Sequence, residues 1–167
     1  SAFNNQQGLP HISTTNDALD YSRIYKIADE FEIDFIIKGN GKEYSRIDEV
    51  AATGFPVIIP LNFPNAYDIS NPETAQWISL NKLKGWETAP YNPAILANHE
   101  IEFCITSSGL DKESDFISNL RLSIKKGLSK QAALAALTTT PASLIEMDDK
   151  IGSLETGKLA NFFIASK

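Results

Sequence analysis

Serine, aspartate and histidine side chains are the candidates for chemistry in this chain of 167 residues. The run Thr106-Ser107-Ser108-Gly109 follows an apolar segment, where an exposed hydroxyl could act as a nucleophile. No Gly-x-Ser-x-Gly elbow surrounds either serine, so we interpret Ser107 and Ser108 as loop residues that satisfy backbone groups. Asp111 follows Gly109 and Leu110, and we expect it to cap the next helix.

The sequence contains two histidines, His11 and His99. His11 falls in a polar, turn-rich stretch. His99 stands at the expected end of a helix, where a positive side chain interacts favourably with the helix dipole. We therefore expect no metal ligands and no cofactor-binding residues in this chain.

Four other positions have a plain structural interpretation. Gly39-Asn40-Gly41-Lys42 lacks the glycine spacing of phosphate-binding loops and is interpreted as a turn. The single cysteine, Cys104, excludes an internal disulfide and is expected to be a buried apolar group. Trp77 is expected in the core. Trp86 could line a pocket in a complete barrel, but we interpret it as packing its own loop.

Composition places the chain among soluble globular proteins, with 43% hydrophobic and 22% charged residues. The net charge is −6 and no basic block occurs, which argues against nucleic acid or an anionic membrane as a partner. No apolar run approaches the roughly 20 residues that span a bilayer. The cysteine content does not fix the cellular compartment.

The pattern of apolar residues predicts a leader or linker over residues 1–15 and a single α/β domain over residues 16–167. We expect strands at 33–37, 56–61, 101–106 and 159–165, and helices at 16–31, 44–52, 72–83, from 92, at 111–127 and at 129–138. Asn92 is expected to cap the helix that it begins. Alternating helices and strands predict a mainly parallel sheet with flanking helices. The pattern alone does not separate an open sheet from part of a barrel.

The end of the chain carries a recognisable signature. A helix contains Ala136-Leu-Thr-Thr-Thr-Pro-Ala142, and Gly152-Ser-Leu-Glu-Thr-Gly-Lys-Leu-Ala-Asn161 follows it. These segments resemble the C-terminal portion of metal-dependent amidohydrolases of the imidazolonepropionase-like type. Asp48–Pro60 and Asn92–Ala97 resemble the late barrel units of the same family. The resemblance implies the second part of a (β/α)8 TIM barrel plus a C-terminal β-sandwich strand, with residues 151–167 as closing hairpin and strand.

The resemblance also points to a site. The family places an aspartate just after the last barrel strand, and Ser108 stands at that position here. A neutral hydroxyl neither neutralises a divalent cation nor acts as a base near neutral pH, whereas a carboxylate can do both. The early His-x-His motif of the family is absent. Ser108 is therefore the one catalytic position that we assign by resemblance, and we expect it to be non-functional.

The resemblance implies a C-terminal fragment of a hydrolase that acts on non-peptide or dipeptide C–N bonds. A complete member would hold a divalent, zinc-like metal and take a small-molecule amide substrate, and this chain alone would be inactive. The alternative is a degenerate, non-catalytic amidohydrolase-like module for structure or interaction. A small α/β binding domain unrelated to hydrolases is a third possibility. The open edges of a partial barrel also raise the possibility of a homodimer.

Overall fold

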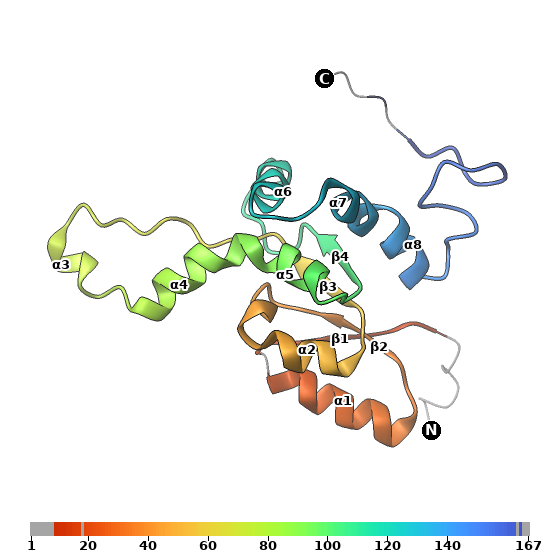
Figure 1. The fold of residues 1–167 in the computed structure, drawn as a ribbon, viewed down its shortest axis with the longest axis horizontal. Coiled ribbons are helices and arrows are strands. Elements are labelled where there is room, and N and C mark those ends of the chain that lie inside the picture. The colour runs from red at the N-terminus through yellow and green to blue at the C-terminus, as the bar shows by residue number, and fades with distance from the viewer. Residues whose placement is uncertain (1–8, 18, 163, 165–167) are drawn as a thin grey trace.

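The computed structural model describes residues 9–17, 19–162 and 164. Its parallel strands form one four-stranded sheet in the order β1-β2-β3-β4 (Figure 1). The strands are β1 (His11–Thr14), β2 (Phe35–Lys38), β3 (Val57–Pro60) and β4 (Phe103–Thr106). Every strand pairs in parallel with the strand before it in the chain. The structure therefore confirms the α/β class and the parallel sheet with flanking helices.

Helices fill the connections between the strands. They are α1 (Leu19–Phe31), the 3₁₀ turn η2 (Glu43–Arg46), α2 (Ile47–Thr53), α3 (Pro72–Ala75), α4 (Leu80–Thr88), η3 (Ala89–Tyr91), α5 (Asn92–Asn98), α6 (Asp115–Lys125), α7 (Lys130–Leu137) and α8 (Thr139–Leu144). Local signals set several ends. The Ser129 hydroxyl accepts the N–H of Ala132 at 3.0 Å and caps α7. Gly54 ends α2 in the left-handed region, with φ of 68°.

One face of the sheet packs against helices and forms the core. Successive strand residues point to opposite faces, so Ile37, Val57 and Ile59, all fully buried, share this face. The core cluster comprises Tyr21, Ile24, Ile37, Val50, Val57, Ile59, Ala94, Leu96, Phe103, Leu128, Ala133 and Ala136. Ile36 and Cys104 are buried on the other face and lie outside this cluster. The expectation that Cys104 is a buried group is confirmed.

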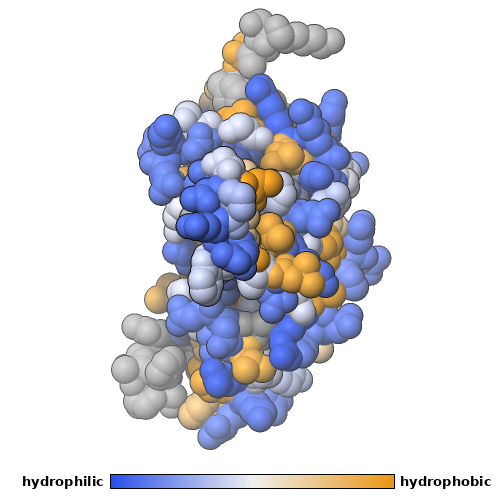
Figure 2. Space-filling model, turned by 90° about the vertical axis from the view of Figure 1, so that its left-hand side faces the viewer, coloured by the Kyte–Doolittle hydropathy of each residue, from blue (hydrophilic) through white to orange (hydrophobic). Residues whose placement is uncertain are grey.

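Residues 62–88 form an arm that projects from the body of the molecule and carries α3 and α4 (Figure 1). The single helix expected over 72–83 is two helices, because Ser79 caps α4 by accepting the N–H of Lys82 at 3.3 Å. Trp77 is 80% exposed, so its expected place in the core was wrong. Figure 2 looks at the tip of this arm and shows apolar atoms among polar ones on its surface.

Two expectations at the chain ends need correction. His11–Thr14 form β1, with Ile12 in register with Ile36, so the leader expected over residues 1–15 is wrong from residue 11 onward. An edge strand pairs with one neighbour only and can carry polar residues, so its sequence resembles that of a loop. Residues 1–8 lie outside the described part.

The strand expected over Leu159–Ala165 is absent from its described residues 159–162 and 164. Leu159 instead donates its N–H to the carbonyl of Lys150 at 2.8 Å, within the closing hairpin region. The four strands of the described sheet are β1 to β4, and residues 159–162 and 164 pair with none of them. Within the described residues, no helix has the length and apolar character needed to cross a membrane.

Candidate functional site at the carboxyl edge of the sheet

The carboxyl ends of the parallel strands meet at one edge of the sheet, which we call the carboxyl edge. The strands end there at Thr14, Lys38, Pro60 and Thr106. In α/β sheets, ligands bind in the crevice outside the carboxyl ends of the strands. The loops that follow these four residues are therefore where binding or catalytic groups are expected to gather.

A buried carboxylate fixes the loop after β2. Glu43 is 1% exposed, and its Oε1 atom accepts the N–H groups of Asn40 at 2.9 Å and Gly41 at 3.1 Å. The Tyr21 hydroxyl donates to the same oxygen at 3.3 Å. Backbone N–H groups that could hold a phosphate are thus occupied by the chain's own carboxylate. The interpretation of residues 39–42 as a turn agrees with this geometry.

Asn92 connects this loop to helix α5. Its Nδ2 group donates to Oε2 of Glu43 at 2.6 Å, and its Oδ1 atom accepts the N–H of Tyr44 at 2.9 Å. The expectation that Asn92 caps α5 was wrong, because Tyr91 precedes the helix and the Asn92 side chain is buried in this network. Burial, and then the Glu43 charge, raise the pKa of Tyr21 far above its ordinary value.

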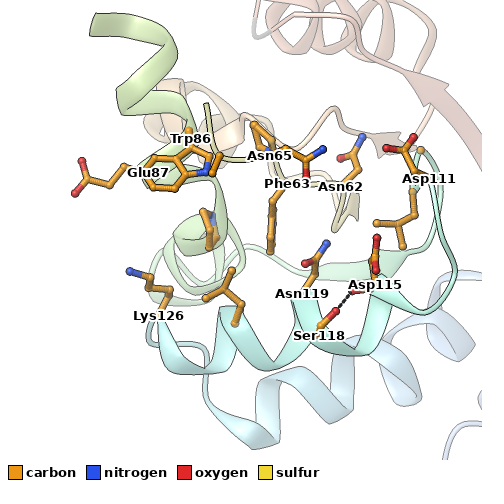
Figure 3. A pocket seen from close by; sticks show the side chains of 16 residues that line it. Asn62, Phe63, Asn65, Trp86, Glu87, Asp111, Asp115, Ser118, Asn119 and Lys126 are labelled. Atoms are coloured by element: carbon orange, nitrogen blue, oxygen red, sulfur yellow. Dashed lines mark hydrogen bonds between the residues drawn. The ribbon is translucent and has the colours of Figure 1, made fainter. Parts of the chain in front are cut away.

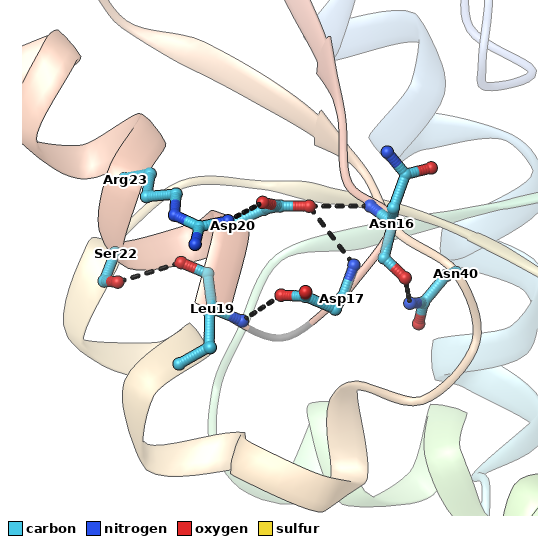
Figure 4. A network of polar contacts seen from close by, with 7 residues as sticks. All are labelled: Asn16, Asp17, Leu19, Asp20, Ser22, Arg23 and Asn40. Carbon is cyan, nitrogen blue, oxygen red and sulfur yellow. Dashed lines mark hydrogen bonds and ion pairs between the residues drawn. The ribbon is translucent and has the colours of Figure 1, made fainter.

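The loop after β1 is tied to the same corner (Figure 4). The Asn40 side chain donates to the carbonyl of Asn16 at 2.8 Å. Asp17 accepts the N–H of Leu19 at 2.7 Å and so caps α1. Asp20 accepts the N–H groups of Asn16 and Asp17, and these hydrogen bonds lower the pKa of its carboxyl group. The first two loops of the carboxyl edge are therefore held by polar groups of the chain itself.

Asn62 lies between the loops that follow β2 and β4. A Cβ atom added to Gly109, whose φ is +78°, would lie 2.7 Å from Nδ2 of Asn62. A Cβ atom added to Gly41 would lie 3.6 Å from its Oδ1 atom. Both loops approach this side chain closely because glycine leaves room for it. The position of Asn62 two residues after the end of the buried strand β3 was the sequence signal that could have identified it.

Ser108 lies in the loop after β4 and is exposed, as is Ser107. Its N–H donates to Oγ1 of Thr106 at 3.2 Å. The expectation that Asp111 caps the next helix was wrong, because α6 begins at Asp115 and Ser114 precedes it. The Asp111 side chain is instead exposed at the rim of a cavity.

This cavity, of about 840 Å³, lies between the end of the arm and helix α6 (Figure 3). Its lining comprises Asn62, Phe63, Pro64, Asn65, Ala66, Trp86, Glu87, Pro90, Gly109, Leu110, Asp111, Asp115, Ser118, Asn119, Leu122 and Lys126. Trp86 is 41% exposed and lines this space, which favours the pocket role over the loop packing that we expected. We call this space the α6 cavity.

A second cavity of about 570 Å³ adjoins the α6 cavity and shares Asn62, Phe63, Pro64 and Trp86 with it. Lys42 and Lys82 line the second cavity, and its lining contains no carboxylate side chain. The lining of the α6 cavity, in contrast, includes Glu87, Asp111 and Asp115. The shared wall therefore separates a basic space from an acidic one.

The two histidines lie away from these cavities. His11 begins β1, and its ring lies 6.1 Å from that of Phe35 between centroids. His99 ends α5, before β4 begins. Both thus stand at the amino end of the sheet, opposite the carboxyl edge. Within the described ranges, no group of three or more histidine, cysteine or acidic side chains is placed to hold a metal ion.

The fold and part of the sequence match known proteins. Residues 87–167 match the model of the amidohydrolase family. The chain also superposes on an amidohydrolase from Thermotoga maritima MSB8, with a TM-score of 0.68 and 20% sequence identity over 93% of this chain. Residues 87–167 are thus similar to the amidohydrolase family, and the chain as a whole shares part of the fold of such a protein. Its sheet and helices correspond to part of the TIM-barrel fold of such proteins, in which active sites lie at the carboxyl ends of the strands.

The structural similarity covers only part of each solved structure. The chain spans 37% of the Thermotoga amidohydrolase, well under two thirds of that protein. A Xaa-Pro dipeptidase with methionine bound in its active site shows a TM-score of 0.46 and 14% identity, over 84% of this chain and 41% of that one. No curated protein matches the chain.

Amidohydrolases are generally metal-dependent, but the carboxyl edge of this chain, as far as the structure describes it, does not fit a resident metal. The residues at the strand ends are Thr14, Lys38, Pro60 and Thr106. Alternation places Lys38 on the same sheet face as Ile36, where its ammonium group would repel a divalent cation. Both carboxylate oxygens of Glu43 already accept hydrogen bonds from the chain. The described donors therefore assemble no metal site.

Proposed function

We propose that this chain is the C-terminal part of an amidohydrolase-like, metal-dependent hydrolase that acts on C–N bonds of non-peptide amides or dipeptides. The complete enzyme would resemble the imidazolonepropionase-like type, and its metal would be held by residues outside this chain. Its β1–β4 sheet would supply one wall of the barrel. The loops of the carboxyl edge would orient a small-molecule substrate and exclude water from one side.

The observation that carries this proposal is the match of residues 87–167 to the amidohydrolase family model, on a parallel sheet like that of a solved amidohydrolase. The expected inactivity of this chain rests on Ser108, which by the resemblance would stand where the family places an aspartate. Its hydroxyl is exposed and neutral. A hydrolytic step needs a group that takes a proton from water near neutral pH, and a serine hydroxyl does so poorly. By itself, the chain is therefore expected to leave amide bonds intact.

Metal analysis and amidase assays of the purified chain test this proposal. We expect well under one zinc per chain after dialysis, and no hydrolysis of N-acyl amino acids, cyclic amides or dipeptides above the uncatalysed rate. About one tightly held metal per chain, with amidase activity lost on chelation, would overturn it.

A degenerate, non-catalytic module is the second candidate, and the Lys38 ammonium group on the carboxyl edge favours it. The intact mass of the native gene product separates the two candidates. A mass well above the 18.4 kDa of this chain supports a longer hydrolase. A mass of 18.4 kDa supports the stand-alone module. In a longer protein, a Ser108→Asp variant that gains zinc binding would indicate a site lost by that one replacement.

The formation of a homodimer stays a prediction, which rests on the two edge strands of the sheet. β1 and β4 bound the described sheet, and unpaired strand edges favour association. Light scattering of the purified chain tests it: a dimer is expected, and a monomer at all concentrations contradicts it.

A further inference from the structure

The α6 cavity has an apolar wall and a polar end. Phe63, Trp86, Pro90 and Leu122 supply apolar surface. Figure 3 shows Asn62, Asp111, Asp115 and Asn119 around the opposite end of the same space. Cavities that bind small molecules combine such an apolar lining with a few convergent polar groups. Its volume of about 840 Å³ is also in the range of small-molecule sites.

The charge of the cavity is negative and uncompensated at the polar end. The lining carries the carboxylates of Glu87, Asp111 and Asp115, and its one cationic side chain is Lys126. Lys126 donates to the Tyr91 hydroxyl at 3.3 Å, and its Nζ atom lies 4.8 Å from the centre of that ring. Figure 3 places Lys126 with Glu87 at the far end from Asp111. Within the described part of the chain, neither Asp111 nor Asp115 forms an ion pair.

The amide groups complete this polar end. Asn119 uses its Nδ2 group to donate to the carbonyl of Leu61 at 2.7 Å, which orients the side chain between β3 and α6. Its Oδ1 atom accepts no hydrogen bond from the described protein groups, so it is left as an acceptor. Acceptors therefore outnumber donors around Asp111 and Asp115, which favours a ligand that donates several hydrogen bonds.

We propose that the α6 cavity binds a primary organic amine that carries an aromatic or alicyclic ring. The protonated amine has three N–H donors and one positive charge, which match the carboxylates of Asp111 and Asp115. The ring lies against Phe63 and Trp86, which contribute apolar contact and, for an aromatic ring, edge-to-face or offset ring packing. This binding requires neither a metal nor hydrolysis, and so it goes beyond the function proposed above.

The neighbouring cavity sharpens the selectivity. Lys42 and Lys82 stand on the other side of the wall formed by Asn62, Phe63 and Pro64. Their positive charge disfavours the cation in that space, while the carboxylates disfavour an anion in the α6 cavity. A positively charged ligand is thereby directed to one of the two adjoining spaces.

Trp86 provides the readout. The chain has two tryptophans, and Trp77 is 80% exposed on the arm, so a Trp77→Phe variant leaves Trp86 as a reporter inside the cavity. Phenethylamine, titrated at pH 7, is expected to change the Trp86 fluorescence with saturation. The neutral isostere 2-phenylethanol and the anion 3-phenylpropionate are expected to bind at least about tenfold more weakly. Added salt should weaken amine binding.

Variants that each remove one carboxylate test which carboxylates bind the amine. In the Trp77→Phe background, Asp111→Asn and Asp115→Asn should each raise the Kd for phenethylamine about tenfold. Asp48→Asn, which removes an exposed carboxylate from α2, should leave it unchanged. Circular dichroism checks that each variant is folded.

Several results would overturn the proposal. Equal binding of the amine, the alcohol and the acid would show that charge does not select the ligand. Binding of glucose in preference to phenethylamine would identify a neutral sugar site instead. An unchanged Kd in folded Asp111→Asn and Asp115→Asn variants, or a Kd raised equally by Asp48→Asn, would remove the carboxylates from the site. These results concern binding alone, so they leave the hydrolase proposal to its own test.

Discussion

Two regions at the carboxyl edge of the sheet differ in the hydrogen bonding of their carboxylates. One is the network of Glu43 with Tyr21, Asn40, Gly41 and Asn92, which we call the Glu43 corner, and the other is the α6 cavity. Glu43 is 1% exposed and accepts hydrogen bonds at both oxygens. Asp111 is exposed at the rim of an open space and forms no ion pair within the described chain. The first carboxylate holds the backbone in place, whereas the second leaves its acceptors available.

The difference implies that the Glu43 carboxylate contributes to folding stability, whereas the Asp111 carboxylate is available to bind a ligand. A buried acceptor whose donors all come from the chain cannot be removed without leaving those donors unpaired. A carboxylate at a cavity rim can be removed at little cost to folding, because water already solvates it. Substitutions around Glu43 should therefore cost much more folding free energy than substitutions at the rim of the α6 cavity.

Removal of the Glu43 carboxylate should give the largest loss of stability. Glu43→Ala leaves the N–H groups of Asn40 and Gly41 without an acceptor, and the Asn92 amide loses its partner. We expect the free energy of unfolding to fall by about 3 kcal/mol or more, measured by urea denaturation at pH 7.

Glu49→Ala is the matched control for this loss. The Glu49 side chain is 44% exposed and pairs with Arg46 at 2.6 Å on the surface. Its removal should cost at most about 1 kcal/mol. Equal losses in the two variants would contradict the role assigned to Glu43.

An added methyl group at Gly39 tests how tightly the corner is packed. A Cβ atom there would clash with the carboxylate of Glu43 and lie 2.9 Å from the Tyr21 hydroxyl. Gly39→Ala is expected to destabilise the chain by about 1–3 kcal/mol in the same urea assay. Gly85→Ala in α4, where the nearest atom is the Tyr44 hydroxyl at 3.5 Å, should be neutral or stabilising by up to about 1 kcal/mol.

Tyr21 should make the corner sensitive to alkali. Burial and the Glu43 charge raise its pKa in the folded state, so above pH 10.0 the unfolded chain loses this proton first. The contribution of Tyr21 to the free energy of unfolding is therefore fully present below pH 10.0. Above that pH it falls by about 1.4 kcal/mol per pH unit. Tyr21→Phe should cost about 1 kcal/mol at pH 7 and remove that part of the slope.

Urea midpoints measured from pH 7 to pH 11 check the Tyr21 prediction. Cys104 also contributes to alkaline loss, because burial and then Glu102 raise its pKa to about 11. The loss of stability that comes from Cys104 ionisation should remain in the Tyr21→Phe variant. Identical slopes for the parent chain and the variant would show that Tyr21 ionises equally in both states.

Asp111→Asn should have the smallest effect on folding. The residue is exposed, and its replacement reduces the negative charge of a chain whose net charge is −6. The free energy of unfolding should stay within about 0.5 kcal/mol of the parent. A loss comparable to that of Glu43→Ala would mean that both regions serve stability and would remove the contrast between them.

Sequence patterns predicted the buried parts of this fold well. Continuous apolar runs marked β3 and β4, because strands covered on both sides carry few polar residues. Ser129, followed by an alanine- and leucine-rich run, marked the start of α7. The polar edge strand His11–Thr14 was not predicted, because its pairing with β2, and not a pattern of apolar residues, defines it as a strand.

The candidate site was less predictable, because distant segments form it. The sequence places Asp111 near Ser108, but not beside Phe63 and Trp86, which come from the arm. Glu43 precedes the helix expected at 44–52, and the sequence pattern assigned it no role. Its burial depends on Tyr21 and Asn92, which are 22 and 49 positions away in the chain. Local patterns carry no information on such encounters.

The order of the strands also bears on how the chain is made. Because each strand pairs with the one synthesised before it, no later strand has to insert between two that are already paired. The sheet can therefore grow at a single edge as the ribosome releases the chain, with β1 first and β4 last. Such growth keeps each newly formed pairing close in sequence, which shortens the search for the correct partner.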